Sequence, residues 1–360
     1  MHWHVLGRGA VGCLWAAHLA RSGQTVTLLV RSAGPPAATT IRVEDAWRAA
    51  AEGAANEGPA AWEQRVSVES VADAPATAEI RNLLVATKAQ DAGRGVGSLA
   101  ARLAERPTVV LLQNGLGAAD DVLADATVRA KRPLLLLGST TQGGYVRDPY
   151  DVVHAGYGLT WLGPSKASLS AWAAEGGEDG AAQAEARFQE AAASLSSTEL
   201  GALTLETAAA MEGRLWGKLA INAALNPQTA LLRCRNGEII ATPEGLAAIR
   251  SVCLEVAEVM AASGLRTLAG DESGDVAELG EALVGFTIDA AERNAQNFSS
   301  MYQDATAGRA TEVGYINGAV VRLAEELGVA VPHNAMLLRQ MRMLESANRS
   351  AAAAAEASGA

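Results

Sequence analysis

The sequence lacks the features that mark several classes of protein. Its three cysteines, Cys13, Cys234 and Cys253, are odd in number and show no metal-ligand spacing, which favours free thiols in a reducing compartment over disulfides. No run approaches the ~20 apolar residues of a membrane-spanning helix. An apolar strand is predicted from residue 3, so we expect no signal peptide. These absences predict a cytoplasmic protein without a membrane partner.

Positive charge and aromatic residues are also scarce. The formal net charge of −11 argues against nucleic acid or an anionic membrane as the main partner, whereas a small anionic ligand needs only local positive charge. Aromatic residues make up 4% of the chain and alanine is abundant, which indicates a helix-rich architecture with enough hydrophobic residues, 49%, for real cores. The five histidines are scattered without ligand spacing, so we expect no metal site.

A glycine-rich turn stands at the start of the chain. Residues 3–6 predict a strand and residues 13–20 a helix, so the six residues between them close a strand–turn–helix unit. In such a unit Gly7 makes the tight turn, Gly9 lets the backbone approach a pyrophosphate, and Gly12 permits close packing of helix on strand. The phosphates would bind to the free N–H groups at the helix N-terminus. The predicted cofactor-binding residues are Gly7, Arg8, Gly9, Ala10, Val11 and Gly12.

The next strand, expected at residues 25–30, ends in Arg31. An NAD site usually carries an acidic residue there for the ribose 2′-hydroxyl, whereas an arginine suits the 2′-phosphate of NADP. Arg31 therefore favours NADPH as the cofactor. The alternative is an ordinary solvated charge at the end of a strand.

Further strands are predicted at residues 82–87 and 108–112, and helical stretches separate them. This alternation indicates βαβ units and a mostly parallel sheet. In such sheets ligands bind at the carboxyl ends of the strands. Lys88 and Asn114 follow the carboxyl ends of these two strands. Two later segments, residues 152–156 and 159–163, predict a hairpin that closes the domain.

The length of 360 residues suits two domains. We expect a dinucleotide-binding domain of the Rossmann type at 1–186, with insertions at 33–65 and 165–186 that are rich in alanine, glycine and glutamate. Helical periodicity replaces the strands from residue 187, which predicts an all-α domain at 187–346. The alanine-rich tail at 347–360 is expected to fray.

One stretch of the second domain, residues 213–226, combines apolar residues with a polar stripe. A helix would place Lys218, Asn222 and Asn226 on one face, because residues four apart stack over successive turns. A buried lysine and two buried carboxamides need partners, so the stripe could line a polar pocket. The alternative is a lysine that extends to the surface beside capping asparagines, since Pro227 suggests that the helix breaks after Asn226.

Many blocks of the chain, in the same order, resemble the ketopantoate reductase (2-dehydropantoate 2-reductase) family. They cover roughly residues 3–345 apart from the two insertions. The blocks are residues 7–12, 31, 87–88, 113–117, 215–222, 226–229, 236–238, 297–304, 311–312 and 315–318. The resemblance implies a Rossmann domain followed by a helical domain like the C-terminal domain of 6-phosphogluconate dehydrogenase. It also implies reduction of 2-dehydropantoate to (R)-pantoate by NADPH, in pantothenate and coenzyme A biosynthesis.

The resemblance also implies roles for individual residues. Lys218 would be the proton donor. The substrate would be held by Asn222, Asn226, Asn236, Asn297 and Ser300. The cofactor would be served by Arg31, Lys88, Asn114, Gly144 and Glu312, together with the glycine-rich turn. We expect the substrate to lie between the two domains and the chain to be a monomer or a homodimer.

The chemistry of these side chains agrees with that reaction. Hydride transfer to a 2-oxo acid turns the ketone oxygen into an alkoxide, which needs a proton and positive charge; the ammonium of Lys218 supplies both. Partial burial could bring its pKa towards neutrality, and Glu312 would stabilise the ammonium by charge pairing. Two alternatives stay open: a related reductase of another 2-oxo acid, and a non-catalytic NADPH-binding sensor. Glu312 could instead pair with an arginine of its own helix, and Asn236 could be a turn residue before Gly237.

Overall fold

The computed structural model describes residues 1–31, 37–48, 60–72, 79–200, 203–271 and 273–358. They form two compact units. The first comprises Met1–Gln113 and Ala118–Met211, and the second comprises Asn114–Gly117 and Glu212–Ala360. This division differs from the expected boundary at residues 186 and 187, which falls inside a helix of the first unit.

The first unit is built on one sheet, which is mostly parallel as the sequence predicts. Its strand order is β11-β10-β7-β6-β5-β1-β2-β4-β3-β9-β8 in the described residues. The strands are β1 (His2–Leu6), β2 (Thr25–Val30), β3 (Ala38–Glu44), β4 (Ala61–Ser70), β5 (Ile80–Val85), β6 (Leu103–Leu111), β7 (Leu134–Thr140), β8 (Gly143–Asp148), β9 (Asp151–Gly156), β10 (Thr160–Pro164) and β11 (Leu203–Leu205). Leu6 is in register with Leu29 of β2 and Val85 of β5, so three parallel strands end side by side where the glycine-rich turn begins.

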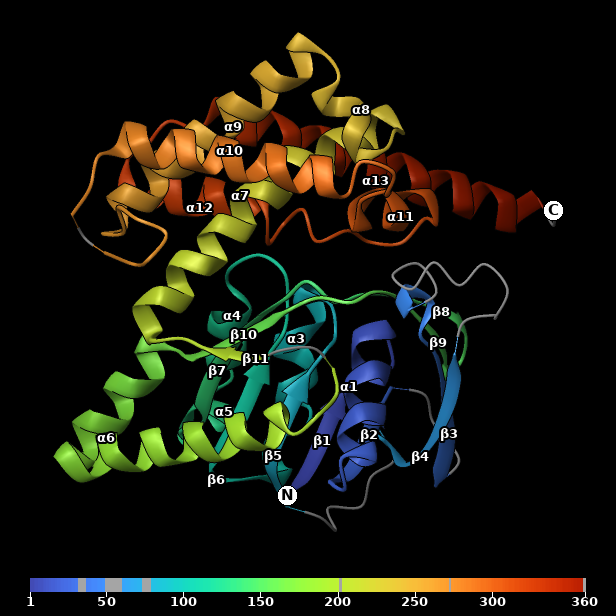
Figure 1. Ribbon diagram of the computed structural model, residues 1–360, viewed down its shortest axis with the longest axis vertical. Helices are drawn as coiled ribbons and strands as arrows, with labels where there is room; N and C mark the ends of the chain where they lie inside the picture. Colours follow the sequence, from blue (N-terminus) through green and yellow to red (C-terminus); the bar gives the residue numbers. More distant parts are fainter. Residues whose placement is uncertain (32–36, 49–59, 73–78, 201–202, 272, 359–360) are drawn as a thin grey trace. The chain divides into compact units, whose positions relative to one another are not determined.

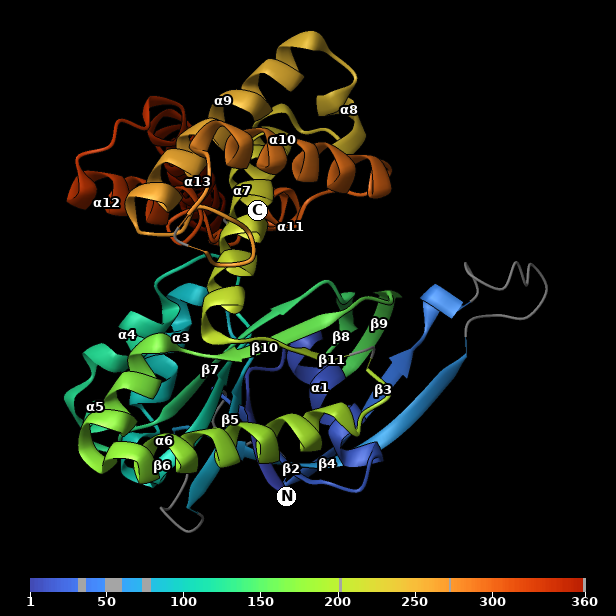
Figure 2. The same cartoon turned by 60° about the vertical axis from the view of Figure 1, so that its left-hand side comes forward.

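Helices cover both faces of this sheet (Figures 1 and 2). Buried residues of α1 (Ala10–Arg21) and α6 (Lys166–Ser196) pack with Trp3 and Val5 of β1 in one core. A second core joins Leu83 and Val85 of β5 to helices on the other face. Those helices are α3 (Ala89–Gly97), α4 (Ala118–Ala124) and α5 (Ala126–Ala130), with the short 3-10 turn η1 (Ala100–Arg102). The alternating strands and helices therefore bury both faces of the central strands.

Both predicted insertions contribute regular structure. Within 33–65, β3 and β4 form an antiparallel pair, and β4 continues the sheet from β2; residues 33–36 and 49–59 lie outside the described residues. Residues 165–186 belong to α6, whose Trp172 and Ala184 are buried against the sheet. Only Gly177 departs from helical geometry there. The alanine-rich segment predicted as an insertion is therefore a packed helix of the first unit.

The predicted hairpin was also wrong. β9 pairs with β8 and β3, whereas β10 pairs with β7 and β11. The side chain of Gln142 holds the corner between them, because it donates to the Gly158 carbonyl at 2.7 Å and accepts from the Gly158 N–H at 3.0 Å. β9 and β10, although consecutive in the chain, thus lie in different parts of the sheet, because each pairs with a strand that is not its neighbour in sequence.

The second unit is helical, as expected, although one short strand, β11, lies beyond residue 187 in the first unit. Its helices are α7 (Ala208–Leu232, which begins in the first unit), α8 (Asn236–Ile240), α9 (Pro243–Ala262), α10 (Val276–Arg293), α11 (Ser300–Thr306), α12 (Asn317–Leu327) and α13 (Pro332–Ser358). Figure 2 shows α7 running in among α9, α10 and α13. Ala220, Ala223 and Ala224 of α7 are buried in the common core. α13 continues into the stretch that we expected to fray, and Asn348 there donates to the Ala305 carbonyl at 2.8 Å.

Helix α7 does not break at Pro227 but continues to Leu232. Proline has no N–H to give to the carbonyl four residues earlier, that of Ala223. The side-chain amide of Asn317 donates to this carbonyl instead, at 3.0 Å. Asn317 is fully buried and also donates to Asn334 at 3.1 Å. A residue 90 positions away along the chain therefore satisfies the group that the proline leaves without a partner.

Candidate active site

The glycine-rich turn of the first unit uses its three glycines in different ways. A Cβ atom at Gly7, where φ is +110°, would lie 3.1 Å from the backbone of Ala86 and Thr87. A Cβ at Gly12 would lie 2.0 Å from the Gly7 carbonyl oxygen. At Gly9, the residue before α1, no heavy atom lies within 4 Å of such a Cβ. The outer glycines therefore serve internal packing, while the middle one opens a space in front of the helix N-terminus that fits a phosphate group.

Gly144 lies close to the same turn. A Cβ atom there would lie 3.2 Å from Cδ1 of Leu14 and 3.6 Å from Cβ of Ala10, both in α1. The structure thus brings Gly144 from β8 next to Ala10 in the first turn of α1. Arg8 and Gly9 are exposed in the turn, and Gly12 is buried.

Arg31 and Lys88 follow the ends of β2 and β5, as expected. Arg31 is 75% exposed, and its Nη1 lies 3.5 Å from Oδ1 of Asp91 in α3. Lys88 is the residue before α3 and is partly buried. The Gln113 amide, from the end of β6, donates to the carbonyls of Val85 and Thr87 at 2.8 and 3.1 Å. These bonds hold the backbone that carries Lys88.

Asn114 follows the end of β6, as expected, and its loop, residues 114–117, belongs to the second unit. Its side chain donates to Oε2 of Glu312 at 3.1 Å, and the Leu116 N–H donates to the Tyr315 carbonyl at 2.8 Å. A Cβ atom at Gly115 would lie 2.1 Å from that carbonyl oxygen, so only glycine permits the approach. Glu312 lies before α12 and not in a helix. The alternative that Glu312 pairs with an arginine of its own helix is therefore excluded.

The pKa of the Lys218 ammonium is strongly shifted. Lys218 lies on α7 between the buried Trp216 and Leu219, and it is itself partly buried. Burial lowers the pKa of its ammonium from the ordinary 10.5 to about 8, while the negative charge of Glu312 opposes this shift. Lys218, Glu312 and Asn114 therefore form one electrostatic group with an amine that titrates close to neutral pH.

The predicted carboxamides come together around the end of α7. The Thr229 hydroxyl donates to the Asn226 carbonyl at 2.9 Å, and it lies 2.7 Å from the hydroxyl of Ser299. The Asn236 N–H donates to the Asn297 carbonyl at 3.0 Å. The segment 297–300 is thus tied to both α7 and α8, so Asn226, Asn236, Asn297 and Ser300 form one polar region; Asn222 lies one turn before Asn226 on the same face.

The side-chain oxygen of Asn236, Oδ1, is buried without a hydrogen-bond partner in the described residues. The residue is 7% exposed and begins α8, and its amide donates to the Asn294 carbonyl at 3.1 Å. An unpaired buried oxygen costs free energy, which a ligand hydroxyl would recover. Asn236 lies in a short helix and not in the turn of the alternative interpretation.

Two further residues of this region, Thr229 and Ser299, were not among the predicted site residues. Ser299, not Ser300, caps α11, because its hydroxyl accepts from the Tyr302 N–H at 3.0 Å. Ser300 is exposed at the first position of the helix. Thr229 links Ser299 to α7. A serine directly before a helical run is a recognised N-cap pattern, so Ser299 could have been predicted from the sequence. The hydrogen bond between Thr229 and Ser299 could not, because the two residues are far apart in the chain.

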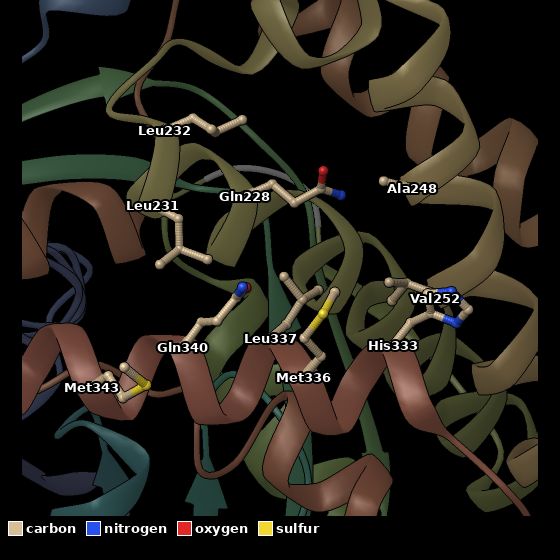
Figure 3. Close-up of a pocket in the computed structure, with 10 residues that line it drawn as sticks. All are labelled: Gln228, Leu231, Leu232, Ala248, Val252, His333, Met336, Leu337, Gln340 and Met343. Carbon is tan, nitrogen blue, oxygen red and sulfur yellow. The ribbon is translucent and has the colours of Figure 1, made fainter.

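A groove elsewhere in the second unit is apolar. Figure 3 shows its lining residues on α7, α9 and α13. The volume of the groove is about 480 Å³. Leu232 and Met343 at its edge are 67% and 71% exposed. The groove contains none of the predicted site residues. No group of three His, Cys, Asp or Glu that could hold a metal occurs in the described part of the chain, where no helix is long and apolar enough to cross a membrane.

Comparison with known families gives two matches. Residues 3–167 match the family "Ketopantoate reductase PanE/ApbA". Residues 210–345 match "Ketopantoate reductase PanE/ApbA C terminal". Together the two matches span most of both units.

Individual relatives agree with these matches. The chain is 30% identical over 341 residues to a 2-dehydropantoate 2-reductase of Vibrio cholerae, covering 95% of this chain and 97% of that one. A solved D-mandelate dehydrogenase with NADH and anilino(oxo)acetate is 20% identical, with a TM-score of 0.74 over 97% of this chain and 99% of that one. A dimeric ketopantoate reductase of Staphylococcus aureus is 20% identical, with a TM-score of 0.69 over 97% and 100%. The two structural likenesses support the fold alone.

Proposed function

Since the chain belongs to the ketopantoate reductase family, an oxidoreductase family, we propose that it reduces 2-dehydropantoate to (R)-pantoate with NADPH, in the cytoplasm. The reaction would be a step of pantothenate and coenzyme A biosynthesis. The observation that carries the proposal is Lys218, a partly buried amine beside Glu312 whose pKa burial lowers to about 8.

The first unit carries residues that fit the cofactor. The open space at Gly9 admits a pyrophosphate to the N–H groups at the start of α1, and Gly144 completes that surface without a side chain. Arg31 provides a guanidinium for the 2′-phosphate. Reduced nicotinamide, when bound, supplies the hydride, and the protein supplies orientation and protons.

The second unit carries residues that fit the substrate. The Lys218 ammonium donates a proton to the ketone oxygen as negative charge develops there, and a pKa of about 8 keeps it largely protonated at neutral pH while allowing proton transfer. Glu312 holds that charge and is itself oriented by Asn114. The carboxamides of Asn222, Asn226 and Asn236 and the segment 297–300 offer donors and acceptors for a carboxylate and a hydroxyl, and the unpaired Oδ1 of Asn236 suits the substrate hydroxyl.

A spectrophotometric panel tests this proposal. Purified protein would be mixed with NADPH or NADH and a set of 2-oxo acids, and oxidation of the cofactor would be followed. We expect the highest kcat/KM for 2-dehydropantoate with NADPH. Turnover of none of the acids would contradict an enzyme and would favour the NADPH-binding sensor.

A second candidate is a reductase of a different 2-oxo acid. The likeness to a D-mandelate dehydrogenase holding NADH and anilino(oxo)acetate supports it, because the same fold there accommodates another acid. The same panel separates the two enzymes: a higher kcat/KM for an aromatic 2-oxo acid such as phenylglyoxylate would replace 2-dehydropantoate as the substrate.

We also propose that the protein is a homodimer. The Staphylococcus aureus relative is a dimer, and the groove of Figure 3 exposes Leu232 and Met343, large apolar side chains that a second copy would cover. Analytical ultracentrifugation should give twice the chain mass, and the double variant Leu232→Glu/Met343→Glu should sediment as a monomer. A wild-type protein that sediments as a monomer would contradict the proposal.

A further inference from the structure

We propose that Arg94, a residue of α3, is a second ligand for the 2′-phosphate of NADPH and that Asp91 opposes it as a competing carboxylate. The inference rests on the proposed use of NADPH and adds two specificity-determining residues to Arg31.

The geometry starts from one carboxylate oxygen. Oδ1 of Asp91 lies 3.5 Å from Nη1 of Arg31 and accepts a hydrogen bond from Nη2 of Arg94. Both guanidinium groups are 75% exposed, whereas Asp91 is 22% exposed. Two cations that reach the same oxygen can reach the same phosphate, and a phosphate offers three acceptor oxygens at higher charge than a carboxylate.

A pocket lies beside this pair of arginines. It has a volume of about 330 Å³ and lies where β1, β2 and α3 meet. Leu6, Val71 and Ala72 give it apolar walls, and Arg31, Asp91 and Arg94 line it with charge. An apolar pocket with a few convergent polar groups is typical of a small-ligand site. An adenosine would place its ring against the apolar walls and its ribose near the charged residues.

One detail of the pocket points to a ligand. Thr87 lines the same pocket, and its hydroxyl oxygen is buried without a hydrogen-bond partner in the described residues. A ribose hydroxyl would satisfy that oxygen.

Asp91 should then weaken the binding of NADPH. Its carboxylate engages both guanidiniums before the cofactor arrives, and it repels a phosphate that takes the same position. Since NADH has no 2′-phosphate, this competition acts on NADPH alone. The ratio of the two dissociation constants therefore reports on Arg94 and Asp91 together.

Calorimetric titration of NADPH and NADH into the full chain tests the proposal. Arg94→Ala should weaken NADPH about tenfold or more and leave NADH within about twofold, as Arg31→Ala should. Asp91→Asn, which keeps the shape and removes the charge, should tighten NADPH several-fold and leave NADH unchanged. Arg81→Ala is the matched control, because it removes an exposed, ion-paired arginine at the amino end of β5. It should change neither affinity.

The outcomes separate this inference from the proposed function. Loss of NADPH selectivity in Arg31→Ala but not in Arg94→Ala would overturn the inference and leave the cofactor proposal intact. Equal losses for both cofactors in Arg94→Ala would also overturn it, since they would indicate a structural role for the Asp91–Arg94 pair. A wild type that binds NADH as tightly as NADPH, with no selective effect of Arg31→Ala, would overturn the NADPH proposal itself.

Discussion

The two units hold their candidate residues by different means. In the first unit the proposed pyrophosphate site consists mainly of backbone N–H groups in the six consecutive positions from Gly7 to Gly12. In the second unit the residues proposed for the substrate are side chains from α7, α8, the start of α11 and the segment before α12. Links between distant residues hold these side chains, such as Thr229 with Ser299 and Asn114 with Glu312.

This difference has a physical origin. A phosphate binds to backbone N–H groups, whose directions follow from a short strand–turn–helix sequence. A proton donor needs a shifted pKa, which depends on burial and on charges contributed by other elements. The first kind of site is therefore damaged by local changes of backbone, and the second by changes to side chains far apart in sequence.

The largest expected effect concerns the proton donor. Lys218→Ala should lower kcat by about 10²–10⁴, the usual contribution of a positioned general acid. The affinity for NADPH should stay within about twofold, because the proposed phosphate ligands lie in the first unit. Steady-state kinetics and calorimetry would measure both, with Lys131→Ala as a control that removes an amine paired with Glu105. A variant that keeps most of its kcat would show that the proton comes from another group.

The glycine-rich turn should respond in two separable ways. Gly9→Ala points a methyl group into open space, so thermal unfolding should be unchanged while NADPH binds about tenfold or more weakly. Gly12→Ala forces a carbon to 2.0 Å from the Gly7 carbonyl oxygen, so it should lower both the melting temperature and NADPH affinity. Equal melting temperatures for the two variants would contradict the division between a ligand-facing and a packing glycine.

The stability of α7 should depend on Asn317. Asn317→Ala leaves the buried Ala223 carbonyl without a donor, which should cost about 1–3 kcal/mol of unfolding free energy. Pro227→Ala restores a backbone N–H for that carbonyl, so the cost of Asn317→Ala should be smaller in this background. Urea unfolding of the four proteins of this double-mutant cycle measures the coupling. Strictly additive costs would mean that Asn317 acts only through Asn334.

The smallest expected effect is a shift of the pH profile. In the proposed reaction the protonated Lys218 donates the proton, so kcat should fall as the pH rises through about 8. The charge of Glu312 raises the pKa of Lys218, so Glu312→Gln should lower that pKa and move the alkaline limb to lower pH. Glu281→Gln, which removes an exposed carboxylate paired with Arg250, is the control and should leave the limb in place. A limb that moves to higher pH would contradict the pairing of Glu312 with the amine.

Much of the fold was predictable from local patterns. Short apolar runs located the central parallel strands β1, β2, β5 and β6, and helical periodicity beyond residue 187 indicated the helical second unit. The errors share one cause. The partner of β10, the packing of α6 and the continuation of α7 past Pro227 are each decided by residues far away in sequence, namely those of β7, the sheet core and Asn317.

By itself the sequence determined the strand–glycine–helix turn and the four-residue spacing of Lys218, Asn222 and Asn226, because both follow from backbone geometry within a few residues. The tertiary structure alone decided the rest. It brought Glu312 close enough to act on the charge of Lys218, left Oδ1 of Asn236 unpaired, and directed Arg31 and Arg94 to one oxygen of Asp91. Burial and electrostatic interaction depend on distance in space, and distance along the chain does not specify them.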